Sequence, residues 1–360
     1  MERALQRIFG IFGYQLSTEL SWLSPLIALP GEEEGGVLLG EDRFGRQVYL
    51  NFATLKNAHG LVAGPSGSGK STLLRDIGLK WLQLGGRAVY VDPSGEHAEW
   101  WGRRGGHVID LRRGIDALAP LSSLGEEWMH RLARIVGTCL NWSPHTTTLF
   151  EYLLNKYDSI SGAVKEAAEL TASGDLVARP IAIASSALQL LEGGSNPLDA
   201  WRATVTVLSM GEMSEDLARL LASVAIDAVW REGIRRGMRH APELLIMLDE
   251  AHRFVDLRPF TEQSYVEGIA RVVRKYAVGV VFASQRFYDI PPAVREQVAF
   301  KLALPGSSSS YLQSVRDVLG ASDDQIGWLA SAQRGRALVY KEGAPRPSAV
   351  NLRLADGVLG

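Results

Sequence analysis

The chain has one cysteine, no long apolar run and almost no net charge, and each absence excludes a class of protein. The single Cys139 cannot form an internal disulfide, which excludes disulfide-stapled secreted scaffolds and fits a reducing compartment. No uninterrupted apolar run approaches the roughly 18 residues of a membrane-spanning helix. With 38 Lys and Arg against 40 Asp and Glu, the formal charge is −2. Any contact with nucleic acid must therefore come from local positive charge.

The first residues give no targeting signal. The first residues include the charged side chains Glu2, Arg3 and Arg7, and no long apolar region precedes a small-residue cleavage site. We expect residues 1 to 36 to form an N-terminal helical arm. Three interpretations stay open for it: an extra helix packed on the rest of the chain, an arm on a neighbouring subunit, or an interfacial membrane helix.

A glycine-rich stretch supplies the strongest functional signal. The apolar residues 61–63 are expected to end a strand, and a helix is expected to open at Ser71. Between them, glycines let the backbone N–H groups turn inward, toward the phosphates of a nucleotide. Lys70 would then contact the outer phosphates, and the Ser71 hydroxyl would hold Mg²⁺. The predicted cofactor-binding set is Gly64, Pro65, Ser66, Gly67, Ser68, Gly69, Lys70, Ser71 and Thr72.

A second buried strand ends in two carboxylates. A strand is expected over residues 243–248, because a continuous apolar run follows Glu243, as is typical of a strand covered on both faces; Asp249 and Glu250 come directly after it. Carboxylates at the carboxyl end of a parallel strand face the ligand crevice. We expect Asp249 to hold the water shell of Mg²⁺ opposite Ser71. Glu250 is expected to polarise a water molecule for attack on the γ-phosphate.

A third apolar strand, expected over residues 278–283, runs into Gln285. Its amide would reach the same edge of the sheet, where it could sense the γ-phosphate or position the attacking water. Gln285 is therefore a candidate catalytic residue beside Lys70 and Glu250.

The spacing of these motifs predicts an insertion. Lys70 and Asp249 lie much further apart than one strand–helix–strand passage requires. The intervening residues show helical periodicity over 126–140, 149–157, 164–170 and 181–191, with turn formers at 142–145 and 193–197. A strand over 203–208 would return the chain to the sheet, followed by a long helix with an arginine-rich end. We expect an α/β, RecA-like parallel sheet: core residues 37–114, a helical insertion over 115–200 and the remaining core over 201–360.

In order and spacing, four segments resemble the HerA/FtsK superfamily of DNA-pumping ATPases. They are the phosphate loop, the strand that ends in Asp92-Pro93-Ser94-Gly95-Glu96, the Asp249-Glu250 segment, and residues 269–276 before Gln285. The resemblance is to the HerA branch and its conjugation-ATPase relatives, and it covers about residues 37–352. Two features depart from HerA proteins. Too few residues precede Gly64 for their β-barrel, and Phe287 replaces a proline.

The resemblance implies an ATP- and Mg²⁺-dependent motor that forms a homo-oligomeric ring of six subunits and pumps DNA. It adds Asp92 and Glu96 beside the nucleotide, although helix capping explains them equally well. It also implies that Arg271 and Arg274, three residues apart on one helix face, complete the neighbouring subunit's site. The departures leave open whether its partner is a nuclease or a membrane channel.

The sequence leaves one main alternative function open and argues against two others. An ATPase that remodels a secretion machine without gripping DNA is the main alternative. A helicase of the DEAD/DEAH type would need a second RecA-like domain, and a transporter ATPase would need a Leu-Ser-Gly-Gly-Gln signature that this sequence lacks. We expect a cytoplasmic location, either free or at the inner face of the membrane through a partner or a further N-terminal segment. The candidate DNA contacts are Arg103, Arg104, Arg253 and Arg258.

Overall fold

The computed structural model describes residues 35–359, apart from 238, 240 and 255–276. The expected arm thus lies almost wholly outside the described residues, as do Arg258, Arg271 and Arg274. The described strands are β1 (Val37–Asp42), β2 (Gln47–Leu50), β3 (Gly60–Ala63), β4 (Arg87–Asp92), β5 (His107–Asp110), β6 (Val205–Ser209), β7 (Leu244–Leu248), β8 (Val278–Ser284), β9 (Phe300–Ala303), β10 (Arg336–Lys341) and β11 (Ser348–Leu352).

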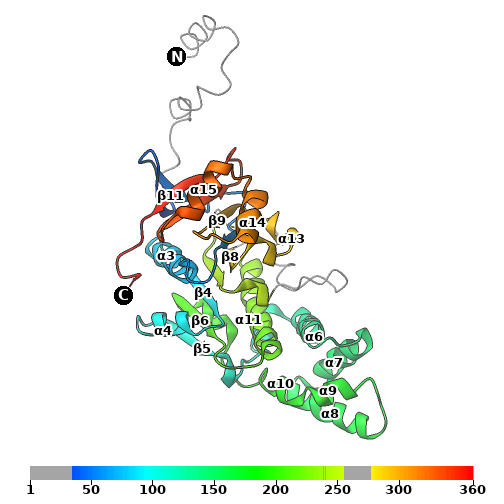
Figure 1. Ribbon diagram of the computed structural model, residues 1–360. Helices are drawn as coiled ribbons and strands as arrows, with labels where there is room; N and C mark the ends of the chain where they lie inside the picture. The colour runs from blue at the N-terminus through cyan, green and yellow to red at the C-terminus, as the bar shows by residue number, and fades with distance from the viewer. Residues whose placement is uncertain (1–34, 238, 240, 255–276, 360) are drawn as a thin grey trace, which may run out of the picture. The chain divides into compact units, whose positions relative to one another are not determined.

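These strands form one sheet in the order β2-β1-β11-β10-β9-β3-β8-β7-β4-β6-β5 (Figure 1). From β9 to β5 all neighbours are parallel, and from β9 to β2 all are antiparallel. The predicted α/β sheet is confirmed. The hairpin β1–β2 was not predicted, and it extends the sheet through pairing of β1 with β11. The phosphate loop follows β3, and β8 separates it from β7.

The described helices either cover the two faces of the sheet or gather at its β5 end. They are α3 (Lys70–Gln83), α4 (Glu96–Gly102), α5 (Leu121–Leu124), α6 (Glu127–Cys139), α7 (Pro144–Tyr157), α8 (Ile160–Ala172), α9 (Arg179–Ile183), α10 (Ser185–Gln189), α11 (Glu215–Arg235), α13 (Pro292–Arg295), α14 (Ser309–Leu319) and α15 (Asp323–Ser331). Short 3₁₀ turns are η2 (Leu111–Arg113), η3 (Pro197–Trp201), η4 (Ala251–Arg253) and η5 (Phe287–Asp289).

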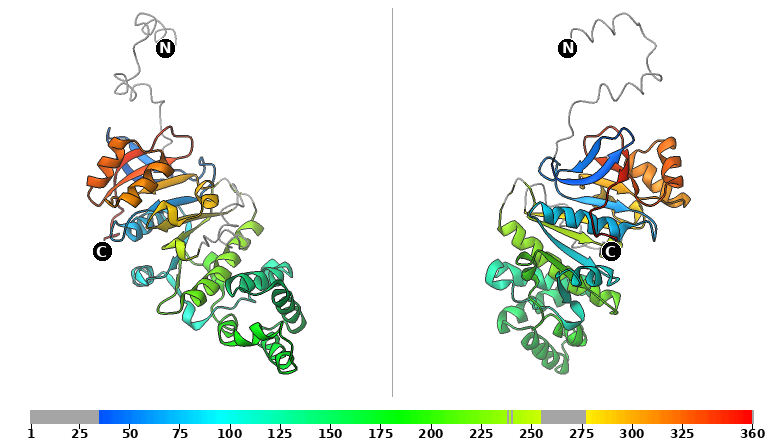
Figure 2. Two further views of the ribbon diagram at one scale, coloured as in Figure 1. Left: turned by 45° about the vertical axis from the view of Figure 1, so that its right-hand side comes forward. Right: turned by 90° about the vertical axis from the view of Figure 1, so that its left-hand side faces the viewer.

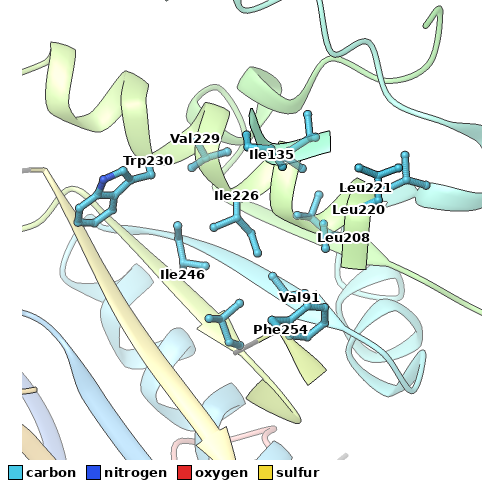
Figure 3. Packing of buried hydrophobic residues seen from close by; sticks show 14 of the residues in the cluster. Val91, Ile135, Leu208, Leu220, Leu221, Ile226, Val229, Trp230, Ile246 and Phe254 are labelled. Carbon is cyan, nitrogen blue, oxygen red and sulfur yellow. The ribbon is translucent and has the colours of Figure 1, made fainter. Parts of the chain in front are cut away.

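The central strands are buried on both faces because alternate side chains enter different cores. In β4, Val89 and Val91 join the cluster that contains α11, whereas Ala88 and Tyr90 join the cluster that contains α3 and α4. Figure 3 shows Ile226 and Val229 of α11 packed over the sheet, with Ile135 of α6 beyond them. This double burial explains the continuous apolar runs of the strands.

The described residues between β5 and β6 contain helices and turns, which gather at the end of the sheet opposite β1 and β2 (Figure 2). Two expectations within this insertion were wrong. Pro144, expected in a linker, is the first residue of α7, because Ser143 caps the helix and proline suits the first turn. The helix expected over 181–191 is divided into α9 and α10. The boundaries at residues 36, 114 and 200 stay a prediction.

Cys139 is buried in the insertion's core, as expected from its helical spacing, and burial raises the pKa of its thiol to about 11. The arginines at the end of α11 have partners within the chain. Arg235 and Arg236 pair with Glu232, and Arg239 pairs with Glu243. This arrangement favours a structural role over nucleic-acid contact. In the part of the chain that the structure describes, none of the helices combines the length and the hydropathy of a membrane span.

A buried histidine is expected to make stability fall in mild acid. His59 Nδ1 accepts a hydrogen bond from the amide of Val280 at 3.1 Å, and burial lowers the pKa of His59 to about 4. The unfolded chain takes up this proton near pH 6.5, so it holds more protons than the folded chain between pH 6.5 and about 4. The free energy of unfolding should therefore decrease as the pH is lowered through that window, by up to about 3 kcal/mol.

Denaturant unfolding at several pH values in this window tests that expectation. His59→Asn keeps an acceptor near Nδ1 but cannot titrate, so its stability should depend less on pH than that of the unsubstituted protein. Parallel pH profiles for the two proteins would assign the acid sensitivity to other groups.

Candidate active site

The phosphate loop leaves β3 and turns into α3 through two glycines in the left-handed region. Gly67 has φ 73° and Gly69 has φ 101°, conformations that residues with a side chain rarely adopt. Lys70 Nζ donates to the carbonyl oxygens of Gly64 at 2.9 Å and Pro65 at 3.4 Å. The loop is also held from outside, since the Tyr311 hydroxyl donates to the carbonyl of Ala63 at 3.2 Å.

Asp249, at the end of β7, lies directly opposite the start of α3. Its Oδ2 accepts hydrogen bonds from Ser71 Oγ at 2.9 Å and from His97 Nε2 at 3.1 Å, and its Oδ1 accepts one from the Glu250 amide at 3.0 Å. Burial would raise the pKa of Asp249, but the hydrogen bonds from His97, Ser71 and the Glu250 amide outweigh it. The pKa therefore lies below its usual value, and the carboxylate stays ionised.

Glu250 adopts a left-handed conformation, with φ 47° and ψ 47°. This conformation is unusual for a residue other than glycine, asparagine or aspartate. It turns the chain sharply from β7 into η4, and the carboxylate then lies 3.8 Å from Lys70 Nζ. Backbone strain of this kind is concentrated at functional sites, where the surrounding structure maintains it.

Gln285 meets Glu250 because β8 lies between β3 and β7 in the sheet. Gln285 Nε2 is 3.5 Å from Glu250 Oε2, and His252 Nδ1 is also 3.5 Å from that oxygen. His252 Nδ1 lies 3.3 Å from Ser284 Oγ as well. The ends of β3, β7 and β8 thus bring Lys70, Glu250 and Gln285 together, as the sequence predicted.

His97 is the residue that sequence reasoning missed. Its ring is fully buried and stacks on Tyr90 at 4.9 Å between ring centroids. Nε2 must donate, since the Asp249 carboxylate accepts, while Nδ1 is buried and has no hydrogen-bond partner among the described residues. His97 thereby fixes the orientation of Asp249. The only signal in the sequence is that His97 comes directly after Glu96. This position does not distinguish it from an ordinary core histidine.

The other two acidic candidates, Asp92 and Glu96, make different contacts. Asp92 is fully buried, and its carboxylate accepts hydrogen bonds from the amides of Gly95 at 3.0 Å and Ala98 at 2.8 Å. The helix-capping interpretation therefore describes Asp92. Glu96 is exposed and pairs with Arg75 of α3 at 3.6 Å. Direct contact of either residue with a nucleotide stays a prediction.

The described candidates for DNA contact differ in how they are held. Arg103, directly after α4, is exposed and pairs with Glu99 of that helix. Arg104 lies over the Trp100 ring at 3.8 Å and donates to the carbonyl of Gly357 at 2.9 Å. Arg253 is half-buried in η4.

The donor set fits a nucleoside triphosphate with Mg²⁺. α3 begins without a side-chain cap, so its first amides are available to phosphate oxygens. In the part of the chain that the structure describes, Ser68 Oγ is buried in the loop without a partner, and the space beside Gly69 is open. Ser71 and Asp249 supply a hydroxyl and a carboxylate oxygen, which suit Mg²⁺.

Comparison with known proteins agrees with this geometry. The family model described as Helicase HerA-like C-terminal matches residues 226–305, which include β7, β8 and the residues between them. The resemblance to the HerA/FtsK superfamily is confirmed. This HerA-like segment carries Asp249, Glu250 and Gln285. None of the curated proteins matches the chain.

Solved structures share this fold over nearly the whole chain. VirB4 of Thermoanaerobacter pseudethanolicus superposes with a TM-score of 0.71 at 16% identity, covering 92% of this chain and 100% of that one. The plasmid coupling protein TrwB in complex with ADP and Mg²⁺ gives a TM-score of 0.61 at 15% identity, covering 93% and 92%. The bacterial conjugative coupling protein TrwBdeltaN70 gives 0.59 at 16%, covering 90% of each chain.

Proposed function

We propose that this protein is an ATP-driven motor of the HerA/FtsK type that forms a ring and moves DNA. The observation that carries the proposal is the cluster of Lys70, Glu250 and Gln285 at the ends of three adjacent strands. The HerA-like segment and the likeness to TrwB, solved with ADP and Mg²⁺, support it. Passage of the DNA across a membrane, as the resemblance to conjugation ATPases suggests, is part of the proposal.

The residues of the proposed nucleotide site have separate roles in hydrolysis. The amides of the phosphate loop and Lys70 bind and orient the phosphates, in place of the present contacts of Lys70 with loop carbonyls. Ser71 and Asp249 hold Mg²⁺, which when bound neutralises charge on the phosphates. Glu250 accepts a proton from the attacking water, and Gln285, beside it, orients that water.

We propose further that Arg271 and Arg274 of one subunit contact the nucleotide of the next. Lys70 is already partly offset by Glu250 at 3.8 Å, so the cluster has little positive charge to spare for the transition state. An arginine supplied from outside would add it. The proposed partners are further copies of this chain, DNA, and a membrane channel or a nuclease.

We place the motor in the cytoplasm or at the inner face of the membrane. The single Cys139 is buried as a thiol, which suits a reducing compartment.

DNA is expected to bind the protein and accelerate its ATP hydrolysis, and added salt should weaken both effects. Contacts with phosphates release counterions, so the logarithm of the affinity should fall linearly with the logarithm of the salt concentration. Hydrolysis would be followed with and without duplex and single-stranded DNA over a salt series. Hydrolysis without DNA at each salt concentration is the control for direct effects of salt on the enzyme.

ATP hydrolysis that neither duplex nor single-stranded DNA changes, together with absent DNA binding, would remove DNA from the proposal. It would favour the alternative, an ATPase that remodels a protein machine such as a secretion pore. An absence of hydrolysis with every polymer would overturn the proposal as a whole.

A further inference from the structure

An arginine that no motif marks lies over the phosphate loop. Arg334 stands in the connection between α15 and β10. A β-carbon placed on Gly67 would lie 3.2 Å from Arg334 Nη2, so the guanidinium approaches the loop from the side of Gly67. Gly67 belongs to the part of the loop whose amides turn toward the nucleotide. The structure therefore brings a second cation, besides Lys70, to the loop.

The sheet topology explains how so distant a residue reaches the loop. β9 is parallel to β3, with Ala63 level with Ala303, whereas β10 is antiparallel to β9, with Leu338 level with Ala303. The residues that precede β10 therefore lie at the edge of the sheet where β3 ends. Gly335, with φ 87°, turns the chain there, and its carbonyl accepts a hydrogen bond from the Leu352 amide at 2.7 Å.

No other interaction engages the Arg334 side chain within the described part of the chain. It is exposed, and it makes no hydrogen bond or ion pair there. Neighbouring arginines are engaged: the Arg336 guanidinium lies 5.9 Å from the centre of the Trp328 ring, and Arg316 pairs with Asp323. An uncompensated guanidinium beside a phosphate loop is suited to bind phosphate, because its planar donors match two phosphate oxygens at once.

We propose that Arg334 binds the β- and γ-phosphates of the nucleotide held by its own subunit. This inference rests on the proposed nucleotide site and adds a residue to it. Arg334 would supply positive charge from within the subunit, separately from any arginine of a neighbour. It would also make the connection between α15 and β10 respond to the presence of phosphate.

The test is a binding measurement by calorimetry with a non-hydrolysed ATP analogue and Mg²⁺. Arg334→Ala should weaken binding of the analogue by about tenfold or more, the usual cost of a lost hydrogen bond to a charged group. Arg334→Lys should lose less, since it keeps the charge. Arg336→Ala, two residues along and also exposed, is the matched control and should bind like the unsubstituted protein.

Inorganic pyrophosphate, used as a competitor, identifies the contact. If Arg334 binds phosphates, pyrophosphate should lose affinity for Arg334→Ala by a factor similar to that of the analogue. A loss confined to the analogue would place the contact on the sugar or base and overturn the inference. The melting temperature without nucleotide should be unchanged, because the side chain is exposed. If Arg334→Ala does not fold, Arg334→Lys and Arg334→Gln carry the comparison.

The outcomes separate this inference from the proposed function. If the unsubstituted protein binds no nucleotide, the proposed function fails. If it binds and Arg334→Ala binds equally well, only the role of Arg334 is overturned. Recovery of hydrolysis on mixing Arg334→Ala with Lys70→Ala subunits would place Arg334 on a neighbour's nucleotide, which also contradicts the inference.

Discussion

Glu250→Gln protein is expected to bind ATP and hold it unhydrolysed, with turnover lowered by about 10²- to 10⁴-fold. Glutamine keeps the size of the side chain and its hydrogen bond to Gln285, but it cannot accept the proton of the attacking water. Lys70, 3.8 Å from Glu250, stays in place for the phosphates. The measurement pairs steady-state hydrolysis with retention of labelled ATP on the protein.

Glu296→Gln provides the control. Glu296 is an exposed glutamate at the end of α13, so its substitution should leave hydrolysis and nucleotide retention unchanged. Near-normal turnover by Glu250→Gln would show that Glu250 is not the base. Loss of both hydrolysis and ATP binding would show instead that the left-handed turn at Glu250 maintains the loop, and the catalytic assignment would have to be withdrawn.

Lys70→Ala and Arg274→Ala proteins are each expected to be nearly inactive, yet to regain hydrolysis when mixed. Lys70→Ala loses the amine that would bind the phosphates. Arg274→Ala loses the arginine that we propose for the neighbour's nucleotide, a change worth about 10³- to 10⁵-fold in rate. In a mixed ring, an Arg274→Ala subunit keeps an intact phosphate loop, and a Lys70→Ala neighbour supplies the arginine.

The mixing experiment needs proof that the subunits exchange, for example by energy transfer between labelled copies. A mixture that exchanges and stays inactive would contradict a site shared between subunits. Full-rate hydrolysis by a strictly monomeric preparation would contradict it equally. Arg271→Ala should behave like Arg274→Ala if both arginines face the neighbouring nucleotide.

The phosphate loop and the two carboxylates could be predicted from the sequence because their chemistry is local. Gly67, Gly69 and Lys70 lie within one short stretch whose spacing encodes the backbone turn and the following helix. The apolar run before Asp249 likewise shows that its strand is covered on both faces. Burial on both faces also determined the fold class, because continuous apolar strands alternating with helices favour a parallel sheet.

The order of the strands could not be predicted, and it decides which side chains meet. Gln285 reaches Glu250 because β8 lies between β3 and β7, a pairing between segments far apart in the chain. The hairpin β1–β2 was missed for a similar reason. Its place in the sheet depends on pairing with β11, at the opposite end of the sequence.

The sequence alone was enough to determine the nucleotide-binding chemistry, the class of fold and the helical insertion, because each follows from local spacing or periodicity. Only the tertiary structure assigned His97 to Asp249, Asp92 to the cap of α4, and Arg334 to the phosphate loop. A buried histidine, a capping aspartate and an exposed arginine have no distinctive sequence pattern. Their roles depend on which distant backbone passes beside them, and the packing of the whole sheet determines that.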